Sequence, residues 1–242
     1  MRGFQARKRE SALRLHQIGA IQFGAFKLNK HKTYPDAPLS PVYVNLRTTD
    51  HPKNPGPLKE HDTLCVSELL YETAVEYGFA SNVVAGVPDA ATPFASLLPK
   101  VLANHGYRGT PKEILPLKKI KDESGDRILL VNSEYMPTGG LLLFDDVVTD
   151  AGRKLDAIQA LRQGGVLVSS IVVVVDREQG GAAQIRERGI SFAAAFTMSE
   201  LLELYLNEGL IDTQMVEAVR SYQRRDQEYM AAQQMLQSRS AL

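Results

Sequence analysis

Short apolar runs alternate along the chain with longer segments in which apolar residues recur at helical spacing, and each run ends at a glycine, a proline or an acidic residue. A parallel β-sheet flanked by helices produces this pattern, because its strands are buried on both faces and its crossover connections are helical. Five runs are predicted as strands: residues 82–86, 113–117, 141–145, 168–176 and 190–196. The pattern therefore predicts an α/β fold.

Helical spacing and end signals predict three long helices. Residues 62–78 are expected to form a helix with Asp62 as its N-cap, and residues 153–163 a helix that ends at two glycines. A third helix is expected from Asp212 onward. It is interpreted as a solvated C-terminal helix, and the alternative is a helix that packs on a partner or on a second copy of the chain. The first fifty residues differ, since β-type alternation follows a helix-like opening, and they are interpreted as a small appended layer. The predicted division is a hood segment 1–50, an α/β core 51–211 and a C-terminal helix and tail 212–242.

The composition is that of an ordinary globular protein: 242 residues, 44% of them apolar, with 28 basic and 28 acidic side chains that cancel. Zero net charge removes the general electrostatic argument for nucleic acid or an anionic membrane as partner. Cys65 is the single cysteine, so no intrachain disulfide can form and no oxidising compartment is required. The longest apolar run has about half the roughly 20 residues of a membrane-spanning helix. We therefore expect a cytoplasmic location.

Residues 140–154 carry the clearest chemical signal. An apolar strand ends there in Asp145 and Asp146, and a short polar turn with a glycine then opens a helix. Ligands of open α/β sheets bind beyond the carboxyl ends of the strands, and a helix N-terminus offers backbone N–H groups to an anion. We expect a phosphate group on the turn at residues 149–153. Sugar hydroxyls, or a Mg²⁺ ion that bridges to a phosphorylated ligand, are the natural partners of the two carboxylates.

Residues 142–153 resemble the phosphoribosyl-pyrophosphate signature of the type I phosphoribosyltransferases. The rest of the chain, from about Ala12 to Tyr222, resembles the orotate phosphoribosyltransferase branch of that family. Five further segments carry this resemblance in the family order: residues 23–26, 40–47, 86–93, 118–122 and 176–181. The fold implied is a parallel sheet flanked by helices with a small N-terminal hood.

The resemblance implies transfer of ribose 5-phosphate from phosphoribosyl pyrophosphate to orotate, giving orotidine 5′-monophosphate and pyrophosphate in pyrimidine biosynthesis. Mg²⁺ is the implied cofactor, reached through the substrate and with no protein ligand assigned. A homodimer is implied as well, in which a loop that begins at Lys118 closes over the partner's site. Closure of such a loop would exclude water and bring ammonium groups onto the pyrophosphate.

The resemblance also implies roles for individual residues. Catalysis falls to Lys118, Lys121, Asp145 and Asp146. Binding of phosphoribosyl pyrophosphate falls to Val87, Pro88, Lys118, Lys121, Asp145, Asp146, Val147, Val148, Thr149, Asp150, Ala151, Gly152 and Arg153. Binding of orotate falls to Arg177, Thr149 and Lys30. The family lysine of the hood aligns with Asn29 without a gap and with Lys30 when one gap is allowed.

The chain departs from the family pattern mainly near the site. The departures are Leu117 for an arginine, Glu123 for a histidine or another loop residue, Ala151 for a glycine, Arg153 for a small hydroxyl residue, the added charge of Asp150, and an insertion at residues 31–39. Two alternatives to orotate transfer therefore stay open. One is a phosphoribosyltransferase for another nucleobase, and the other is a regulatory protein that binds phosphoribosyl pyrophosphate without catalysis.

Overall fold

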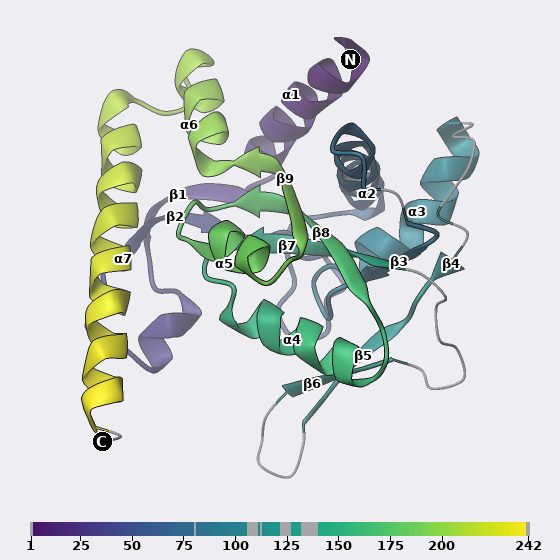
Figure 1. Ribbon diagram of the computed structural model, residues 1–242. Helices are drawn as coiled ribbons and strands as arrows, with labels where there is room; N and C mark the ends of the chain where they lie inside the picture. Colours follow the sequence, from purple (N-terminus) through teal and green to yellow (C-terminus); the bar gives the residue numbers. More distant parts are fainter. Residues whose placement is uncertain are drawn as a thin grey trace.

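A five-stranded parallel sheet forms the centre of the molecule, in a computed structural model that describes residues 2–79, 81–105, 111, 113–121, 127–131 and 140–240 (Figure 1). The strand order is β4-β3-β7-β8-β9, and every neighbouring pair is parallel. Their bounds are β3 Val83–Gly86, β4 Glu113–Ile114, β7 Leu141–Val148, β8 Val168–Asp176 and β9 Ser191–Thr197. Four of the predicted strands are confirmed in this sheet, and the fifth, at residues 113–117, contributes only its first two residues.

The predicted strand at residues 113–117 divides into two elements. β4 ends at Ile114, and Leu117 begins β5 (Leu117–Lys121), which pairs antiparallel with β6 (Arg127–Val131) in a separate sheet. Pro116 lies between them, and a proline has no backbone N–H to donate to a ladder. One apolar run therefore serves two sheets, and the second sheet carries the lysine-rich segment away from the core.

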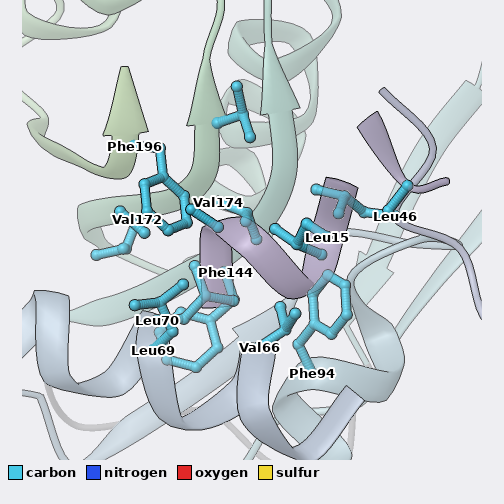
Figure 2. Close-up of a cluster of buried hydrophobic side chains, with 14 of the residues drawn as sticks. Leu15, Leu46, Val66, Leu69, Leu70, Phe94, Phe144, Val172, Val174 and Phe196 are labelled. Carbon is cyan, nitrogen blue, oxygen red and sulfur yellow. The ribbon is translucent and has the colours of Figure 1, made fainter. Parts of the chain in front are cut away.

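Helices cover both faces of the central sheet. The helices are α1 Arg2–Gln17, α2 Glu60–Glu76, α3 Thr92–His105, α4 Gly152–Gln163, α5 Gly181–Glu187, α6 Met198–Asn207 and α7 Thr213–Ser240. Apolar side chains of α2 and α3 pack with Phe144 and Val172 on one face (Figure 2). Those of α4 and α5 pack with Leu143 and Val173 on the other. Successive strand residues thus alternate between two cores. In the described part of the chain, no helix is both long and apolar enough to cross a membrane.

The first fifty residues form the appended layer that the alternation predicts. After α1, strands β1 (Ile21–Phe26) and β2 (Ser40–Val44) pair antiparallel in a two-stranded sheet, with the short 3-10 helix η1 (Asn29–Lys32) between them. Leu15, Ile21, Val42 and Leu46 are buried in the same cluster as one face of the central sheet. The layer therefore has no separate hydrophobic core of its own among the described residues.

Two acidic residues define helix starts, one of them not as expected. α2 begins at Glu60 rather than after Asp62, which instead lies in the first turn and accepts a hydrogen bond at 3.1 Å from the backbone N–H of Lys59. The carboxylate still stabilises the start of the helix, from inside its first turn. Asp212 is confirmed at the start of α7, since its carboxylate accepts a hydrogen bond at 2.8 Å from the N–H of Met215.

Candidate functional site

Three loops meet at the carboxyl edge of the central sheet, where ligands of such sheets bind. The N–H of Val87, after β3, donates to the carbonyl of Phe144 in β7 at 2.9 Å. The N–H of Arg177, after β8, donates at the same distance to the carbonyl of Val148. The structure therefore brings the segments that begin at Val87, Thr149 and Arg177 side by side.

Asp145 and Asp146 point to opposite faces of β7. Asp145 shares the α4 face with Leu143, and its side chain is only 4% exposed. Its Oδ2 atom lies 2.6 Å from the Nζ atom of Lys154, in the first turn of α4. Asp146 is half-buried. Of the two adjacent acids, Asp145 is thus held inside the molecule by a lysine, and Asp146 is the one open to a ligand.

Burial and charge act together on this pair. Burial raises the pKa of the Asp145 carboxyl to about 6, opposed by the Lys154 ammonium and assisted by the Asp146 carboxylate. Burial alone would lower the pKa of Lys154, but the attraction of Asp145 and Asp146 outweighs it and raises that pKa. Lys154 was not among the predicted site residues. The available signal was its place in the first helical turn, where a cation is disfavoured unless a carboxylate faces it.

The predicted phosphate turn is occupied by side chains of the chain itself. The N–H of Ala151 donates to Oε1 of Gln184 at 3.0 Å, and the N–H of Gly152 donates to Oδ1 of Asp150 at 3.2 Å. Ala151 has a φ of −97°, so alanine fits in place of the family's glycine. A phosphate bound to these two amides would replace the Gln184 and Asp150 oxygens. The backbone of Arg153 lies in α4, whereas its side chain falls outside the described residues.

Gly181 sets how closely the third loop approaches this turn. Its N–H donates to the carbonyl of Thr149 at 2.9 Å, and a Cβ atom at Gly181 would lie 2.7 Å from that carbonyl oxygen. Only glycine permits this approach. Thr149 and Arg177, both predicted to bind orotate, are therefore brought near one another by the backbone of the two loops.

The turn after β3 and the lysine-rich hairpin line a common cleft. A Cβ atom at Gly86 would lie 2.0 Å from the carbonyl oxygen of Ala91, so this tight turn requires glycine. Beyond it, an open cleft of about 520 Å³ is lined by Pro88, Asp89 and Lys118, among others. The exposed Lys118 is thus near the turn predicted to bind pyrophosphate. Lys121 belongs to β5, but its side chain lies outside the described residues, as do residues 122–126 with Glu123.

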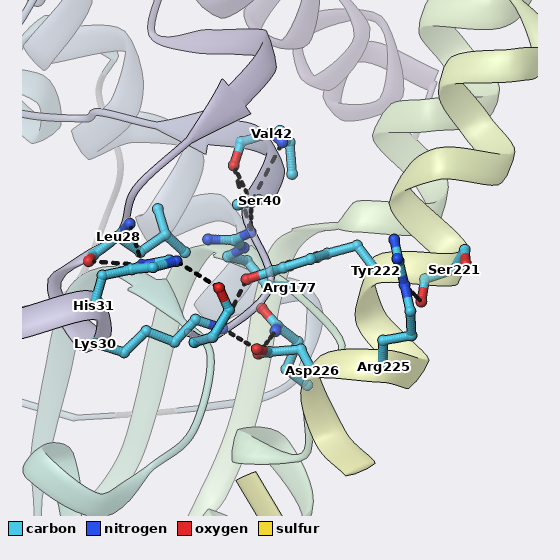
Figure 3. A network of polar contacts seen from close by, with 12 residues as sticks. Leu28, Lys30, His31, Ser40, Val42, Arg177, Ser221, Tyr222, Arg225 and Asp226 are labelled. Carbon is cyan, nitrogen blue, oxygen red and sulfur yellow. Dashed lines mark hydrogen bonds and ion pairs between the residues drawn. The ribbon is translucent and has the colours of Figure 1, made fainter. Parts of the chain in front are cut away.

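The two cations predicted for orotate are engaged within the chain (Figure 3). Arg177 is 5% exposed, and its Nη2 atom donates to Oγ of Ser40 in β2 at 2.9 Å. Burial lowers the pKa of this arginine, which still stays charged. The Lys30 ammonium, in η1, pairs with the carboxylate of Asp226 and donates to the hydroxyl of Tyr222 at 2.9 Å. Both partners belong to α7.

The first part of α7 is therefore packed, and the prediction of a solvated C-terminal helix is wrong for it. Val219 and Tyr222 are fully buried, and Asp226 is 6% exposed. Sequence reasoning missed Tyr222 and Asp226 as possible site residues because Gln, Arg and Met dominate around them. Their i, i+4 spacing, which places both on one helix face, was the available signal.

The sequence is similar to those of known proteins. No family model matches the chain. Orotate phosphoribosyltransferase from Pyrobaculum aerophilum is 34% identical over 193 residues, which cover 78% of this chain and 86% of that protein. Uridine 5′-monophosphate synthase from Bos taurus is 29% identical over 208 residues, which cover 86% of this chain but 39% of that longer protein.

Solved structures agree at the level of the fold. The crystal structure of orotate phosphoribosyltransferase from Aeropyrum pernix superposes with a TM-score of 0.61 at 23% identity, covering 83% of this chain and 98% of that one. The five-stranded parallel sheet with its flanking helices thus has a type I phosphoribosyltransferase fold. Together with the identity to the Pyrobaculum protein, this shows that the chain belongs to the orotate phosphoribosyltransferase family.

Proposed function

We propose that the chain transfers ribose 5-phosphate from phosphoribosyl pyrophosphate to N1 of orotate, in pyrimidine biosynthesis. The observation that carries the proposal is the meeting of three loops at one sheet edge, through the hydrogen bonds from Val87 to Phe144, from Arg177 to Val148 and from Gly181 to Thr149. One loop suits pyrophosphate, one the ribose phosphate and one the base. Family membership supports assigning them in this way.

The reaction breaks the bond from ribose C1 to the pyrophosphate oxygen and forms a bond from C1 to N1 of the base, whose proton passes to the departing pyrophosphate or to water. Positive charge develops on the ribose and negative charge on the leaving group, so the protein contributes mainly positioning and electrostatics. Asp146 would hold the ribose hydroxyls near the developing cation. The amides of Ala151 and Gly152 would hold the 5-phosphate, and Lys118 would stabilise the pyrophosphate. Lys121 has the same proposed role.

The cleft near Lys118 suits Mg²⁺ bound through the substrate. Its lining includes Asp50 and Asp89, and oxygen ligands of this kind are those that Mg²⁺ takes. Among the described residues, no group of three or more His, Cys, Asp or Glu side chains forms a metal site. Mg²⁺ would then take one or two carboxylates from the protein and its other ligands from phosphate oxygens and water. When bound, the ion would neutralise charge on the pyrophosphate.

The test is an assay of the full chain with Mg²⁺, phosphoribosyl pyrophosphate and one base at a time: orotate, uracil, hypoxanthine or adenine. Consumption of orotate with release of pyrophosphate is expected. Consumption of another base alone would contradict the assignment of orotate, and binding of phosphoribosyl pyrophosphate without turnover of any base would contradict catalysis.

A variant separates the two substrates. Asp146→Asn is expected to lower kcat/KM for phosphoribosyl pyrophosphate by about 100-fold or more, because it removes a carboxylate near the developing positive charge. Orotate binding should change much less. Asp156→Asn, at an exposed position on α4, is the matched control and should leave both constants unchanged. A larger effect of Asp146→Asn on orotate binding than on phosphoribosyl-pyrophosphate use would contradict the assignment.

A second candidate function is transfer to an uncharged base. The observation that favours it is the internal engagement of both cations predicted for the orotate carboxylate, Arg177 by Ser40 and Lys30 by Asp226. The uracil, hypoxanthine and adenine arms of the assay test it directly.

We further infer a homodimer with a shared loop, a cytoplasmic location, and a division into hood 1–50, core 51–211 and tail 212–242. The family resemblance supports the dimer, and the single cysteine suits a reducing compartment. Sedimentation of the full chain tests the dimer. A monomer that turns over orotate at full rate would contradict loop sharing.

A further inference from the structure

One face of α7 lies against the residues expected to contact the base (Figure 3). Nε2 of Gln223 donates to the carbonyl of Arg177 at 2.7 Å, and Nε2 of Gln227 donates to the carbonyl of Glu178 at 3.3 Å. These two glutamines are four residues apart, as are Tyr222 and Asp226, so one helical stripe supplies all four contacts. The helix therefore forms one wall of the proposed base site.

Tyr222 lies between the two cations of this site. Its ring centroid is 5.0 Å from Nζ of Lys30 and 6.0 Å from Cζ of Arg177. Both distances are within the range of cation–π attraction, which is strengthened here because the ring is fully buried. The tyrosine thus holds the hood residue Lys30 and the core residue Arg177 against one helix.

Asp226 supplies the anion of this cluster. Its carboxylate pairs with the Lys30 ammonium through one oxygen and accepts a hydrogen bond from Nε2 of Gln179 at 2.6 Å through the other. The Asp226 side chain is 8% exposed and that of Lys30 17%, so water screens their attraction weakly. A carboxylate held between an ammonium and an amide N–H₂ is in the environment that a carboxylated ligand would need.

The inserted residues 31–39 pack on the same helix. The ring of Tyr34 contacts that of Tyr229 edge-on, with centroids 6.3 Å apart. His31 is buried, and its Nε2 atom lies 3.0 Å from the carbonyl oxygen of Ala37. The insertion thus keeps η1, which carries Lys30, beside α7.

We propose that the carboxylate of Asp226 is an internal occupant of the base site, with which a carboxylated base must exchange to reach Lys30. Two carboxylates cannot share one ammonium without repulsion in a weakly screened site. Asp226 therefore weakens the binding of a carboxylated base such as orotate, which must displace it from Lys30, and leaves the binding of an uncharged base unchanged. This inference rests on the proposed function, because it takes Lys30 to be part of the base site.

Binding without turnover tests the inference. Orotate and, separately, uracil are titrated calorimetrically into the full chain in the absence of phosphoribosyl pyrophosphate. Asp226→Asn is expected to bind orotate at least about tenfold more tightly than the wild type, which corresponds to about 1.4 kcal/mol. Its affinity for uracil should not change. Glu228→Gln, at an exposed position of the same helix, is the matched control and should behave as the wild type.

Two results would overturn the inference: no gain in orotate affinity in Asp226→Asn, or an equal gain for both bases. The gain must also vanish when Lys30→Met is added, because the ammonium is then absent. These titrations need no catalysis. A wild type that turns over no base would count against the proposed function and leave this test intact.

A measurement on the wild type covers the case in which Asp226→Asn does not fold. Hydrogen exchange of the amides at residues 222–230 should become faster when orotate is added and stay the same when uracil is added. Exchange that orotate leaves unchanged or slows would mean that Asp226 keeps its place on Lys30, and the inference would be wrong.

Discussion

Lys154 occupies the first turn of α4, where the partial positive charge of a helix N-terminus disfavours a cation. Its ammonium is stabilised there by the buried carboxylate of Asp145, 2.6 Å away. Taking two charges out of water costs several kcal/mol, and removing one partner alone is strongly destabilising. The pair therefore ties the carboxyl-terminal half of β7 to the first turn of α4.

Lys154→Met is expected to lower the free energy of unfolding by about 3 kcal/mol at pH 8, because Asp145 then lacks its cation. With Lys154 present, the pKa of Asp145 is already raised to about 6, and without it the pKa rises further. The folded chain then binds this proton more tightly than the unfolded chain does. Stability of the variant therefore falls as the pH rises from about 4 through the raised pKa.

Urea denaturation of the wild type and of Lys154→Met at pH 5 and at pH 8 measures the stability that the variant has lost. This loss should be larger at pH 8. Adding Asp145→Asn to Lys154→Met removes the buried charge and should recover most of the lost stability at pH 8. An equal loss for Lys154→Met at both pH values would contradict the electrostatic explanation.

The residues that sequence reasoning located are those with a local signature. Asp145, Asp146 and Thr149 come at the end of the predicted apolar strand 141–145; the structure extends this strand to Val148, so that both acids lie inside β7 near its carboxyl end and Thr149 directly follows it. The signals at Lys154 and Asp226, a place in a first helical turn and an i, i+4 spacing, do not name a partner, because each contacts a residue that only the fold brings close. A lysine on a helix is usually solvated, and burial beside a carboxylate depends on the angle at which that helix leaves its strand.

At the scale of elements, α7 has two unlike parts. Its first part carries Val219, Tyr222 and Asp226, all buried. In its second part the described side chains of Ala231, Ala232, Met235 and Leu236 are exposed. Packing of an apolar face, rather than helix propensity, supplies most helical stability in proteins. The first part of α7 is therefore expected to contribute much more to the stability of the fold than the second.

Truncation separates the two parts of α7. A chain that stops after Met230 should keep a melting temperature within about 2 °C of the full chain, because the described side chains beyond it bury little surface. A chain that stops after Ser221 loses Tyr222 and Asp226 and should melt at least about 5 °C lower. Thermal melts followed by circular dichroism measure both. Equal melting temperatures for the two truncations would show that the contacts of Tyr222 and Asp226 do not stabilise the fold.

The β5–β6 hairpin is the element that presents Lys118 to the cleft beside Pro88. Lys118→Ala is expected to lower kcat/KM for phosphoribosyl pyrophosphate by about 10- to 100-fold, since an ammonium near the leaving group stabilises developing negative charge. Steady-state kinetics with orotate in excess measures it. Lys27→Ala, at an exposed position in the hood, is the control. An equal loss of kcat/KM in both variants would mean that the loss comes from the change in net charge and not from the position of Lys118 at the cleft.

At the scale of the whole molecule, the hood and the core form one unit. Apolar residues of α1, β1 and β2 belong to the same buried cluster as one face of the central sheet. The hydroxyl of Tyr205, in α6, donates to the carbonyl of Ala12 in α1 at 2.8 Å, and Arg177 bonds Ser40. Hood and core are therefore expected to unfold together.

Urea unfolding should show a single transition, with the same midpoint by far-ultraviolet circular dichroism and by tyrosine fluorescence. Tyrosines report on both parts, because Tyr43 lies in the hood, Tyr205 in α6, and the chain contains no tryptophan. Tyr205→Phe should lower the free energy of unfolding by about 1 to 2 kcal/mol without separating the two probes. Two resolved midpoints in the wild type would mean that the hood folds as a domain of its own.

The sheet could be predicted from the sequence, and its contacts with the hood and α7 could not. Each strand of the sheet lies in a mostly apolar run with its own end signal, so the five runs were visible one at a time. The docking of α7 depends on Tyr222 and Asp226 meeting Lys30 and Arg177, which lie far away in the chain. The order of apolar and polar residues within α7 does not show which distant residues the helix contacts.

The long separation of these contacts constrains how the chain acquires its structure during synthesis. The partner of Ala12 lies 193 residues later, at Tyr205, and the partner of Ser40 lies 137 residues later, at Arg177. Chains emerge from the ribosome with the N-terminal end first. The apolar side of the hood therefore lacks its later partners until β8, β9 and α6 have been translated. Aggregation of the nascent chain is most favoured during this stage.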